Sequence, residues 1–168
     1  VHISTLPISF KNCFDLGILG EGEQTFAEVI KSFIKYKKLN YSDLIKIDGL
    51  VFNQDSNIRV TKTRKFIEPL DSIPLPAWHL VNKNYFKRNA LVTFGEFGRH
   101  GVILTSRGCP YNCIFCSTRK LWHKVRFHSP EYVLNQIADL VYNYKVSHIQ
   151  IWDDLFTIDK KRLQRLAP

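Results

Sequence analysis

The apolar residues at the start of the chain follow the spacing of a strand, a tight turn and a helix. Residues 14–20 form a short apolar run that ends at a glycine. In residues 24–38 the apolar positions recur at spacings of three and four, which predicts one buried helical face. These positions are Phe26, Val29, Ile30, Phe33 and Ile34. Strand, turn and helix are the repeating unit of a doubly wound α/β domain, so residues 1–38 are predicted to be the last unit of one.

The middle of the chain, residues 39–83, has the pattern of a connector with its own small sheet. Residues 47–52 and 58–63 are runs with the composition of β-strands and flank a polar stretch at 53–57, which predicts a hairpin. Three prolines follow within residues 68–76. Because each proline lacks a backbone donor and favours an extended predecessor, this segment is predicted to be a stiff linker at a domain boundary.

The last part, residues 84–168, alternates strands with helices. An apolar strand is predicted at 101–106 and a second at 148–154. Between them, Ser-Pro-Glu at 129–131 is typical of a helix start, and a helix from 159–166 follows the second strand. This order predicts parallel strands joined by right-handed crossovers. Functional loops are then expected after the carboxyl ends of the two strands.

Composition and charge are those of an ordinary globular chain. The sequence has 168 residues, 45% of them hydrophobic and 23% charged, with a formal net charge of +9. These values argue against a disordered or fibrous protein. The longest stretches without a charged residue, 72–82 and 108–118, are far shorter than the roughly 20 apolar residues of a membrane span. No signal-peptide pattern is present, so we expect a cytoplasmic protein without a membrane span.

Three of the four cysteines lie within one short loop. Cys109, Cys113 and Cys116 have the spacing C-x3-C-x2-C, whereas Cys13 stands alone and is expected to be a small buried hydrophobic residue. A disulfide scaffold would spread its cysteines along the chain, so the cluster favours a metal site in a reducing compartment. Soft thiolates select zinc, copper(I) or iron–sulfur clusters. A structural zinc needs a fourth ligand, which His123 would supply, whereas a four-iron cluster held by three cysteines keeps one iron open for catalysis.

The cysteine loop, Ser-Arg-Gly-Cys-Pro-Tyr-Asn-Cys-Ile-Phe-Cys at 106–116, resembles the cluster loop of the radical S-adenosylmethionine superfamily. The resemblance implies that Cys109, Cys113 and Cys116 bind a four-iron four-sulfur cluster whose fourth iron chelates S-adenosylmethionine. It also implies reductive cleavage of that cofactor to a 5′-deoxyadenosyl radical, with Phe115 against the adenine. By the same resemblance, residues 84–168 are the first βα units of a partial TIM-type radical S-adenosylmethionine barrel.

The end of the second predicted strand supports this resemblance. Trp-Asp-Asp-Leu-Phe-Thr at 152–157 is similar to a segment in one branch of the superfamily, where a strand-end acid binds the amino group of S-adenosylmethionine. Strand alternation places Asp153 on the face of Ile149 and Ile151 and Asp154 on the other face. If the isoleucines pack outward on helices, Asp154 points inward. Either acid would alternatively cap the next turn.

The first part of the chain resembles the end of a Rossmann-like cobalamin-binding domain. Relatives in that branch end this domain in a Gly-Glu-Gly-Glu turn, which matches Gly20, Glu21, Gly22 and Glu23. Residues 1–4 look like the tail of the Gly-Gly-x-His segment that precedes it. The resemblance therefore makes Gly20, Glu21 and Gly22 candidate cofactor-binding residues, with cobalamin a possible cofactor of the full-length protein.

These resemblances lead to one principal hypothesis and two alternatives. The principal hypothesis is a fragment of a radical S-adenosylmethionine enzyme for methyl transfer, cyclisation or rearrangement of a small molecule, reduced by a donor such as flavodoxin or ferredoxin. A complete (β/α)8 barrel typically needs about 250 residues, so we expect a piece of a larger enzyme. The alternatives are a tRNA-modifying enzyme of the superfamily, which the positive charge would suit, and a non-catalytic zinc- or nucleic-acid-binding module. We expect no nucleic-acid partner, because basic runs are usually solvated faces.

Overall fold

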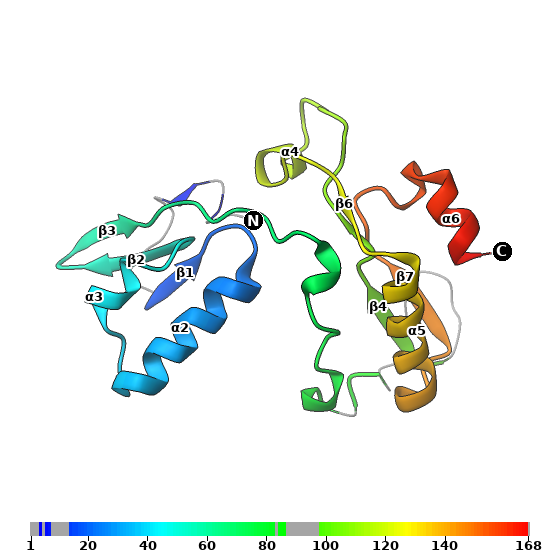
Figure 1. The fold of residues 1–168 in the computed structure, drawn as a ribbon, viewed down its shortest axis with the longest axis horizontal. Helices are drawn as coiled ribbons and strands as arrows, with labels where there is room; N and C mark the ends of the chain where they lie inside the picture. Colours follow the sequence, from blue (N-terminus) through cyan, green and yellow to red (C-terminus); the bar gives the residue numbers. More distant parts are fainter. Residues whose placement is uncertain (1–3, 5, 8–13, 83, 87–97, 168) are drawn as a thin grey trace. The chain divides into compact units, whose positions relative to one another are not determined.

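The computed structural model describes residues 4, 6–7, 14–82, 84–86 and 98–167. The chain divides into two compact units, Val1–Glu68 and Pro69–Pro168, which are taken separately below (Figure 1). Both combine helices with small sheets, as expected of an α/β protein. The three-part division at residues 38 and 83 stays a prediction, and Cys13 lies outside the described residues. No helix among the described residues has both the length and the apolar character that crossing a membrane requires.

The unit Val1–Glu68 is built on a three-stranded antiparallel sheet in the order β1-β2-β3. Strand β1 is Leu16–Ile18, and β2 (Leu50–Gln54) and β3 (Asn57–Val60) form the hairpin that the sequence predicts. The hairpin turns at Asp55 and Ser56, whose φ angles of 50° and 62° suit the twist of a two-residue turn. A doubly wound domain has parallel strands, so this antiparallel sheet does not by itself establish the domain remnant predicted for residues 1–38.

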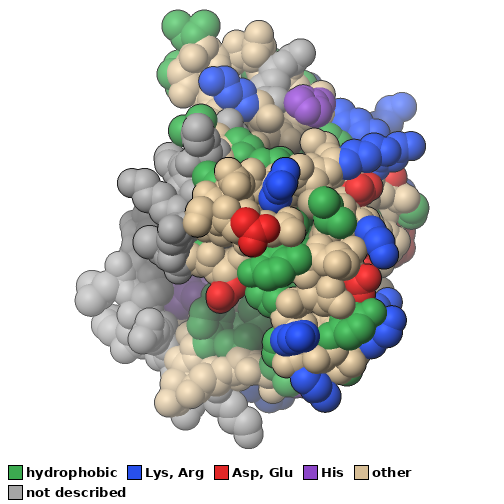
Figure 2. Space-filling view, turned by 90° about the vertical axis from the view of Figure 1, so that its left-hand side faces the viewer, with side chains coloured by type: hydrophobic (Ala, Val, Ile, Leu, Met, Phe, Trp, Pro, Cys, Tyr) green, Lys and Arg blue, Asp and Glu red, His purple; other side chains and the backbone are tan. Residues whose placement is uncertain are grey.

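One face of the sheet is covered by α2 (Gly22–Tyr36) and α3 (Tyr41–Leu44). Helix α2 buries Thr25 and Val29, and Val29 joins Leu44, Ile47, Leu50 and Phe52 in the core. The prediction of one buried apolar face is wrong for the rest of the stripe, because the narrow sheet covers only the side of α2 that carries Thr25 and Val29. The exposed members are Phe26, Ile30, Phe33 and Ile34. Figure 2 shows apolar side chains at the surface between Lys and Arg side chains.

The unit Pro69–Pro168 is organised around two parallel strands and the helix that connects them. Strands β4 (His100–Ile103) and β7 (His148–Ile151) pair in register from His100 with His148 to Ile103 with Ile151. Helix α5 (Pro130–Tyr144) packs on them through a core of Phe86, Ile103, Val133, Leu140 and Val146, and Ile149 and Ile151 pack against this core. The strand, helix and strand predicted here are confirmed, and they bring the carboxyl ends of β4 and β7 side by side.

Short elements at these carboxyl ends complete the unit. After β4 the chain forms β5 (Ser106–Arg107), which pairs antiparallel with β6 (Arg126–Phe127) and encloses the cysteine loop and α4 (Thr118–Leu121) (Figure 1). The sequence did not predict this two-stranded ladder, since each strand has only two residues. The remaining short elements are η2 (Leu70–Ser72), η3 (Trp78–Leu80), η4 (Phe156–Ile158) and α6 (Lys160–Leu166).

Candidate functional site

The cysteine loop leaves the sheet at the carboxyl end of β4, where the alternating pattern predicts a functional loop. Cys109 is half-buried, Cys113 and Cys116 are exposed, and all three are free thiols. The amide of Cys116 donates a hydrogen bond to the carbonyl of Cys113 at 3.1 Å, which makes a tight turn of the second half of the loop. The two exposed thiols therefore belong to one compact turn.

Gly108 fixes the start of this loop. Its φ of +96° lies in the region that favours glycine, and a Cβ placed there would be 2.5 Å from the carbonyl oxygen of Lys124. It would also lie 3.1 Å from the Cβ of Trp122. The segment that follows α4 therefore packs directly on the backbone next to Cys109, and only a glycine permits this approach.

Asp153 ties the end of β7 to the strand that leads into the cysteine loop. Its carboxylate accepts hydrogen bonds from the Thr105 amide at 2.6 Å and the Thr105 hydroxyl at 2.5 Å. It also accepts from the Ser106 amide at 3.1 Å and the Ser106 hydroxyl at 2.7 Å. A carboxylate offers about four lone-pair positions, so these donors use its hydrogen-bonding capacity. Asp153, predicted to be a cofactor-binding candidate, is therefore engaged as a clamp within the protein.

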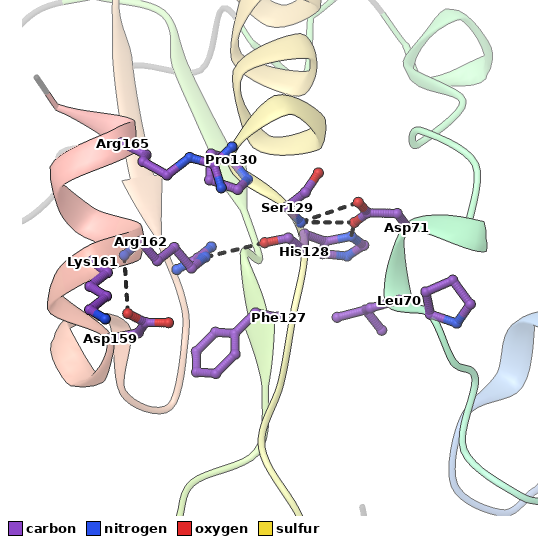
Figure 3. Close-up of a pocket in the computed structure, with 11 residues that line it drawn as sticks. Leu70, Asp71, Phe127, His128, Ser129, Pro130, Asp159, Lys161, Arg162 and Arg165 are labelled. Atoms are coloured by element: carbon purple, nitrogen blue, oxygen red, sulfur yellow. Dashed lines mark hydrogen bonds and ion pairs between the residues drawn. The ribbon is translucent and has the colours of Figure 1, made fainter.

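A buried arginine that the sequence did not single out supports the same clamp. Arg162 of α6 is 6% exposed and donates from Nη2 to the Thr105 carbonyl at 2.9 Å. Its Nε donates to the His128 carbonyl at 3.2 Å (Figure 3). Burial lowers the pKa of Arg162, while the charges of Asp153 and Asp159 oppose that shift. Arg162 thus braces the chain just after β4 by its hydrogen bond to the Thr105 carbonyl.

The second acid, Asp154, lies beside the cysteine loop. It is exposed, and the hydroxyl of Thr118 lies 3.4 Å from its Oδ1. Hydrogen bonds from the hydroxyl and the amide of Thr118 lower the pKa of Cys116, against a smaller opposing effect of the Asp154 charge. Asp154 is therefore close enough to Cys116 for its charge to affect the pKa of that thiol. Unlike the carboxylate of Asp153, that of Asp154 is exposed to solvent.

Large apolar side chains project from the same region. Phe115, the predicted adenine contact, is 88% exposed, and Ile114 beside it is fully exposed. Directly after β7 the side chain of Trp152, two residues before Asp154, is 65% exposed. Several large, exposed apolar side chains in one region are typical of a binding surface.

The donor set of the loop fits a metal centre built on thiolates. Three thiols at this spacing are soft ligands, and the lowered pKa of Cys116 favours the thiolate that binds metal. Across the described residues, however, no three side chains of His, Cys, Asp or Glu are gathered in the geometry of a metal site. The fourth ligand proposed for a zinc site, His123, is exposed on the segment after α4 and is not assembled with the thiols.

The glycine-rich turn predicted to bind a cofactor lies in the other unit. Gly20, with φ +72°, donates its amide to the hydroxyl of Ser4 at 2.9 Å, and Gly22 begins α2. Glu21 is buried, and its Oε2 accepts a hydrogen bond from the Ile67 amide at 2.7 Å. Its carboxylate is therefore used to fix the end of that unit, which the sequence pattern did not indicate.

A second feature missed by the sequence patterns is the pairing of buried His128, at the start of α5, with Asp71. Oδ1 of Asp71 lies 3.0 Å from Nδ1 of His128 and accepts the Ser129 amide at 3.0 Å (Figure 3). The His128 ring also stacks on Tyr132 at a centroid distance of 3.9 Å. Asp71, His128 and Ser129 border a cavity of about 400 Å³ that Arg162 also lines. The pair fastens the linker to the amino end of α5.

Comparisons with known proteins find proteins similar to this chain. No family model matches the chain. An uncharacterized methyltransferase of Pyrococcus horikoshii is 36% identical over 154 residues, which cover 89% of this chain and 30% of that protein. An anaerobic magnesium-protoporphyrin IX monomethyl ester cyclase of Cereibacter sphaeroides is 31% identical over 150 residues, covering 88% of this chain and 23% of that protein.

A solved structure shows the fold. The radical S-adenosylmethionine methyltransferase TsrM of Kitasatospora setae, with cobalamin and a [4Fe-4S] cluster bound, superposes with a TM-score of 0.63 at 18% identity. The match covers 98% of this chain and 31% of that one. The chain is thus similar over most of its length to this methyltransferase and this cyclase, and it shares the fold of a radical S-adenosylmethionine methyltransferase. The chain spans less than a third of the length of each of these proteins.

Proposed function

We propose that this chain is part of a radical S-adenosylmethionine enzyme in which Cys109, Cys113 and Cys116 hold a four-iron four-sulfur cluster. The observation that carries the proposal is the position of the three-thiol loop at the carboxyl end of a parallel strand pair, anchored there by Asp153. When bound, the cluster and S-adenosylmethionine would supply one-electron cleavage to a 5′-deoxyadenosyl radical. The protein's own contribution is to hold the thiols and to leave one coordination position open.

The two adjacent acids take different roles in this proposal. Asp153 positions the loop, because its carboxylate already accepts hydrogen bonds from the amides and hydroxyls of Thr105 and Ser106. Asp154 is assigned to the amino group of S-adenosylmethionine, since it is exposed and lies beside the thiol turn. A carboxylate suits an ammonium group by charge and by hydrogen bonding. Phe115, exposed in the same loop, is assigned to the adenine.

The reaction class proposed for the full-length enzyme is methyl transfer or cyclisation on a small molecule. The relatives named above are a methyltransferase and a cyclase, and the chain covers only part of each. In this proposal β4, α5 and β7 are the first units of a TIM-type barrel, and residues 1–38 end a Rossmann-like domain. Cobalamin is proposed as a cofactor of the full-length protein, with no role for the Glu21 carboxylate, which Ile67 already engages.

The test is metal analysis and turnover of the anaerobically purified full chain. A brown protein with about four irons and four sulfides per chain, which releases 5′-deoxyadenosine and methionine on reduction, is expected. Replacing Cys113 with Ala should abolish both, whereas Cys13→Ala is the matched control and should retain them. A colourless protein with stoichiometric zinc would contradict the proposal and favour a binding module.

A further inference from the structure

The cavity of about 400 Å³ beside the start of α5 lies wholly within the unit Pro69–Pro168. Its walls come from η2, β6, the amino end of α5 and α6 (Figure 3). None of the residues assigned above to the cluster or to S-adenosylmethionine lines it. Its volume suits a small organic molecule, because ligand cavities typically measure about 300–1,000 Å³.

A buried donor at this cavity lacks an acceptor. Arg162 lines the cavity, and its Nε and Nη2 donate to the carbonyls of His128 and Thr105. Its Nη1 is also buried, and no residue in the described part of the chain accepts a hydrogen bond from it. The Phe127 ring lies 5.3 Å from Cζ of Arg162 but has no acceptor oxygen. Since buried donors are nearly always paired, Nη1 indicates an acceptor that a ligand would bring.

The acids that line the cavity are already engaged. Oδ1 of Asp71 accepts the Ser129 amide and lies 3.0 Å from Nδ1 of His128. Oδ1 of Asp159 accepts the Arg162 amide at 3.0 Å and so caps α6. The charged lining residues are Asp71, Asp159, Lys161, Arg162 and Arg165. Three cations against two acids leave one positive charge when His128 is neutral, which favours a ligand with a single negative charge.

Lys161 is the cation at the cavity that is available to a ligand. Arg165 is paired with Glu131, and Arg162 is buried with two of its three nitrogens engaged. Lys161 is exposed, and within the described residues it forms no ion pair. It directly precedes Arg162 in α6, so its ammonium and Nη1 of Arg162 are the two positive groups left at the same cavity.

Apolar side chains form another part of the wall. They are Pro69, Leu70, Phe127 and Pro130. A bare inorganic anion would leave this surface unused, whereas a molecule with a short hydrocarbon part would remove it from water. The lining therefore combines one available positive charge, one unpaired buried donor and an apolar wall.

We propose that this cavity binds a small organic acid, with its carboxylate on Arg162 Nη1 and the Lys161 ammonium and its hydrocarbon part against Leu70 and Phe127. A guanidinium donates to a carboxylate in the plane of both groups, and such charge-assisted hydrogen bonds are among the strong ones. A carboxylate carries the single charge that the lining favours, whereas a phosphate monoester carries more. The site needs no cluster, because none of these residues is a thiol ligand, so it goes beyond the proposed function.

The experiment titrates the full chain with four probes by calorimetry: hexanoate, hexanol, hexylammonium and inorganic phosphate. Hexanoate should bind, and hexanol should bind about tenfold more weakly or less, since it lacks the charge that Arg162 and Lys161 face. Hexylammonium should give no binding heat, and phosphate should bind more weakly than hexanoate. Hexanol binding as tightly as hexanoate would show a merely apolar cavity, and tighter binding of phosphate would show a phosphate site. Either result overturns the assignment to an organic acid.

Two neighbouring lysines of α6 provide matched variants. Lys161→Glu should weaken hexanoate binding about tenfold, because it replaces an attracting charge at the cavity by a repelling one. Lys160→Glu makes the same change one residue earlier on the same helix, outside the cavity lining, and should bind hexanoate as the wild type does. Both lysines are exposed, so both variants should fold. Equal losses in the two variants would contradict the site.

The role of Arg162 can be followed without replacing it. In protein labelled with ¹⁵N-arginine, the Nε–H signal of Arg162 reports on a guanidinium that is held by the His128 carbonyl. Hexanoate should shift this signal in proportion to the occupancy measured by calorimetry. If hexanoate binds and shifts the signal of exposed Arg165 but leaves that of Arg162 unchanged, the carboxylate lies elsewhere and the proposal is wrong.

Discussion

Asp153 holds Thr105 by two hydrogen bonds at once, one from its amide at 2.6 Å and one from its hydroxyl at 2.5 Å. The two residues are 48 positions apart and sit at the carboxyl ends of neighbouring parallel strands. Because Thr105 is fully buried and directly precedes the strand that enters the thiol loop, this contact sets where the loop begins. The position of Cys109 therefore depends on an acid that follows the neighbouring strand, β7.

Replacing Asp153 with Asn should damage the loop more than the same change at Asp154. Asparagine offers one acceptor oxygen and an NH2 that meets donors, so the amides and hydroxyls of Thr105 and Ser106 lose partners at a cost of about 1–3 kcal/mol. Asp154→Asn should leave the free energy of unfolding nearly unchanged, since its carboxylate is exposed. Urea unfolding of the two variants measures this difference in the free energy of unfolding.

The same pair of variants separates positioning from binding. Asp154→Asn should assemble a normal iron content but bind S-adenosylmethionine more weakly, whereas Asp153→Asn should lose iron. Titration of each variant with S-adenosylmethionine, together with iron analysis, provides the comparison. Weaker binding in a fully loaded Asp153→Asn protein, with Asp154→Asn unaffected, would reverse the two assignments.

Arg162 and Arg165 are a second matched pair, three residues apart on α6. Arg162→Met leaves the buried carbonyls of Thr105 and His128 without their donor, which predicts a loss of about 2–4 kcal/mol. Arg165 makes an exposed ion pair with Glu131, so Arg165→Met should cost about 0–1 kcal/mol. Denaturant unfolding of both variants measures the difference, and equal losses would show that Arg162 is not a brace.

Local patterns predicted the framework of the site because they depend on neighbours in sequence. The Ser129 hydroxyl caps α5 by accepting the Tyr132 amide, as Ser-Pro-Glu indicates, and the two strands flanking α5 are parallel. The thiol spacing predicts metal chemistry at the loop, which stays a prediction. What local patterns could not predict are contacts such as Arg162 to Thr105 and His128 to Asp71, each between residues 57 positions apart.

The apolar stripe of α2 shows what helical periodicity alone does not predict, namely which of its positions are buried. Periodicity correctly predicted a helix, but it does not say what covers each position. Val29 is buried, whereas Phe26 is 53% exposed, because the sheet formed by the described residues of this unit has only three short strands. Burial of a helical face depends on the size of the surface opposite it, which the spacing of its residues does not encode.

Gly108 should tolerate no side chain. Gly108→Ala combines a positive φ with a Cβ 2.5 Å from the Lys124 carbonyl, so we expect a loss of stability of about 1–3 kcal/mol and a lower iron content. Gly20→Ala is the matched control, because its φ is also positive but nothing lies within 4 Å of the added Cβ. It should lose only about 1–2 kcal/mol for the backbone conformation and no iron. Thermal unfolding with iron analysis distinguishes steric displacement of the loop from backbone strain.

The stability of the unit Pro69–Pro168 should fall in acid through His128 before its carboxylates are protonated. Burial lowers the pKa of His128 below its ordinary 6.5, the charge of Asp71 opposes this, and Arg107 and Arg162 reinforce it. The neutral ring donates its Nδ1 proton to Asp71. As the pH falls below 6.5, His128 therefore becomes protonated in the unfolded chain before it does so in the folded chain, and this difference lowers the free energy of unfolding. The contribution of His128 to stability is full above 6.5 and is lost between that value and its lowered pKa.

Asp71 adds a second range, at lower pH, over which the unit loses stability. Burial raises the pKa of Asp71, but hydrogen bonds from Ser129 and His128 outweigh it and bring the pKa below its ordinary 3.8. The stabilisation from Asp71 is therefore complete above 3.8 and is lost as the pH falls through the lowered value. Guanidinium unfolding at pH 8, 6 and 5 should show a decline in the wild type that is smaller in His128→Gln. Parallel curves for the two proteins over this range would contradict the assignment, since the other histidines are shared.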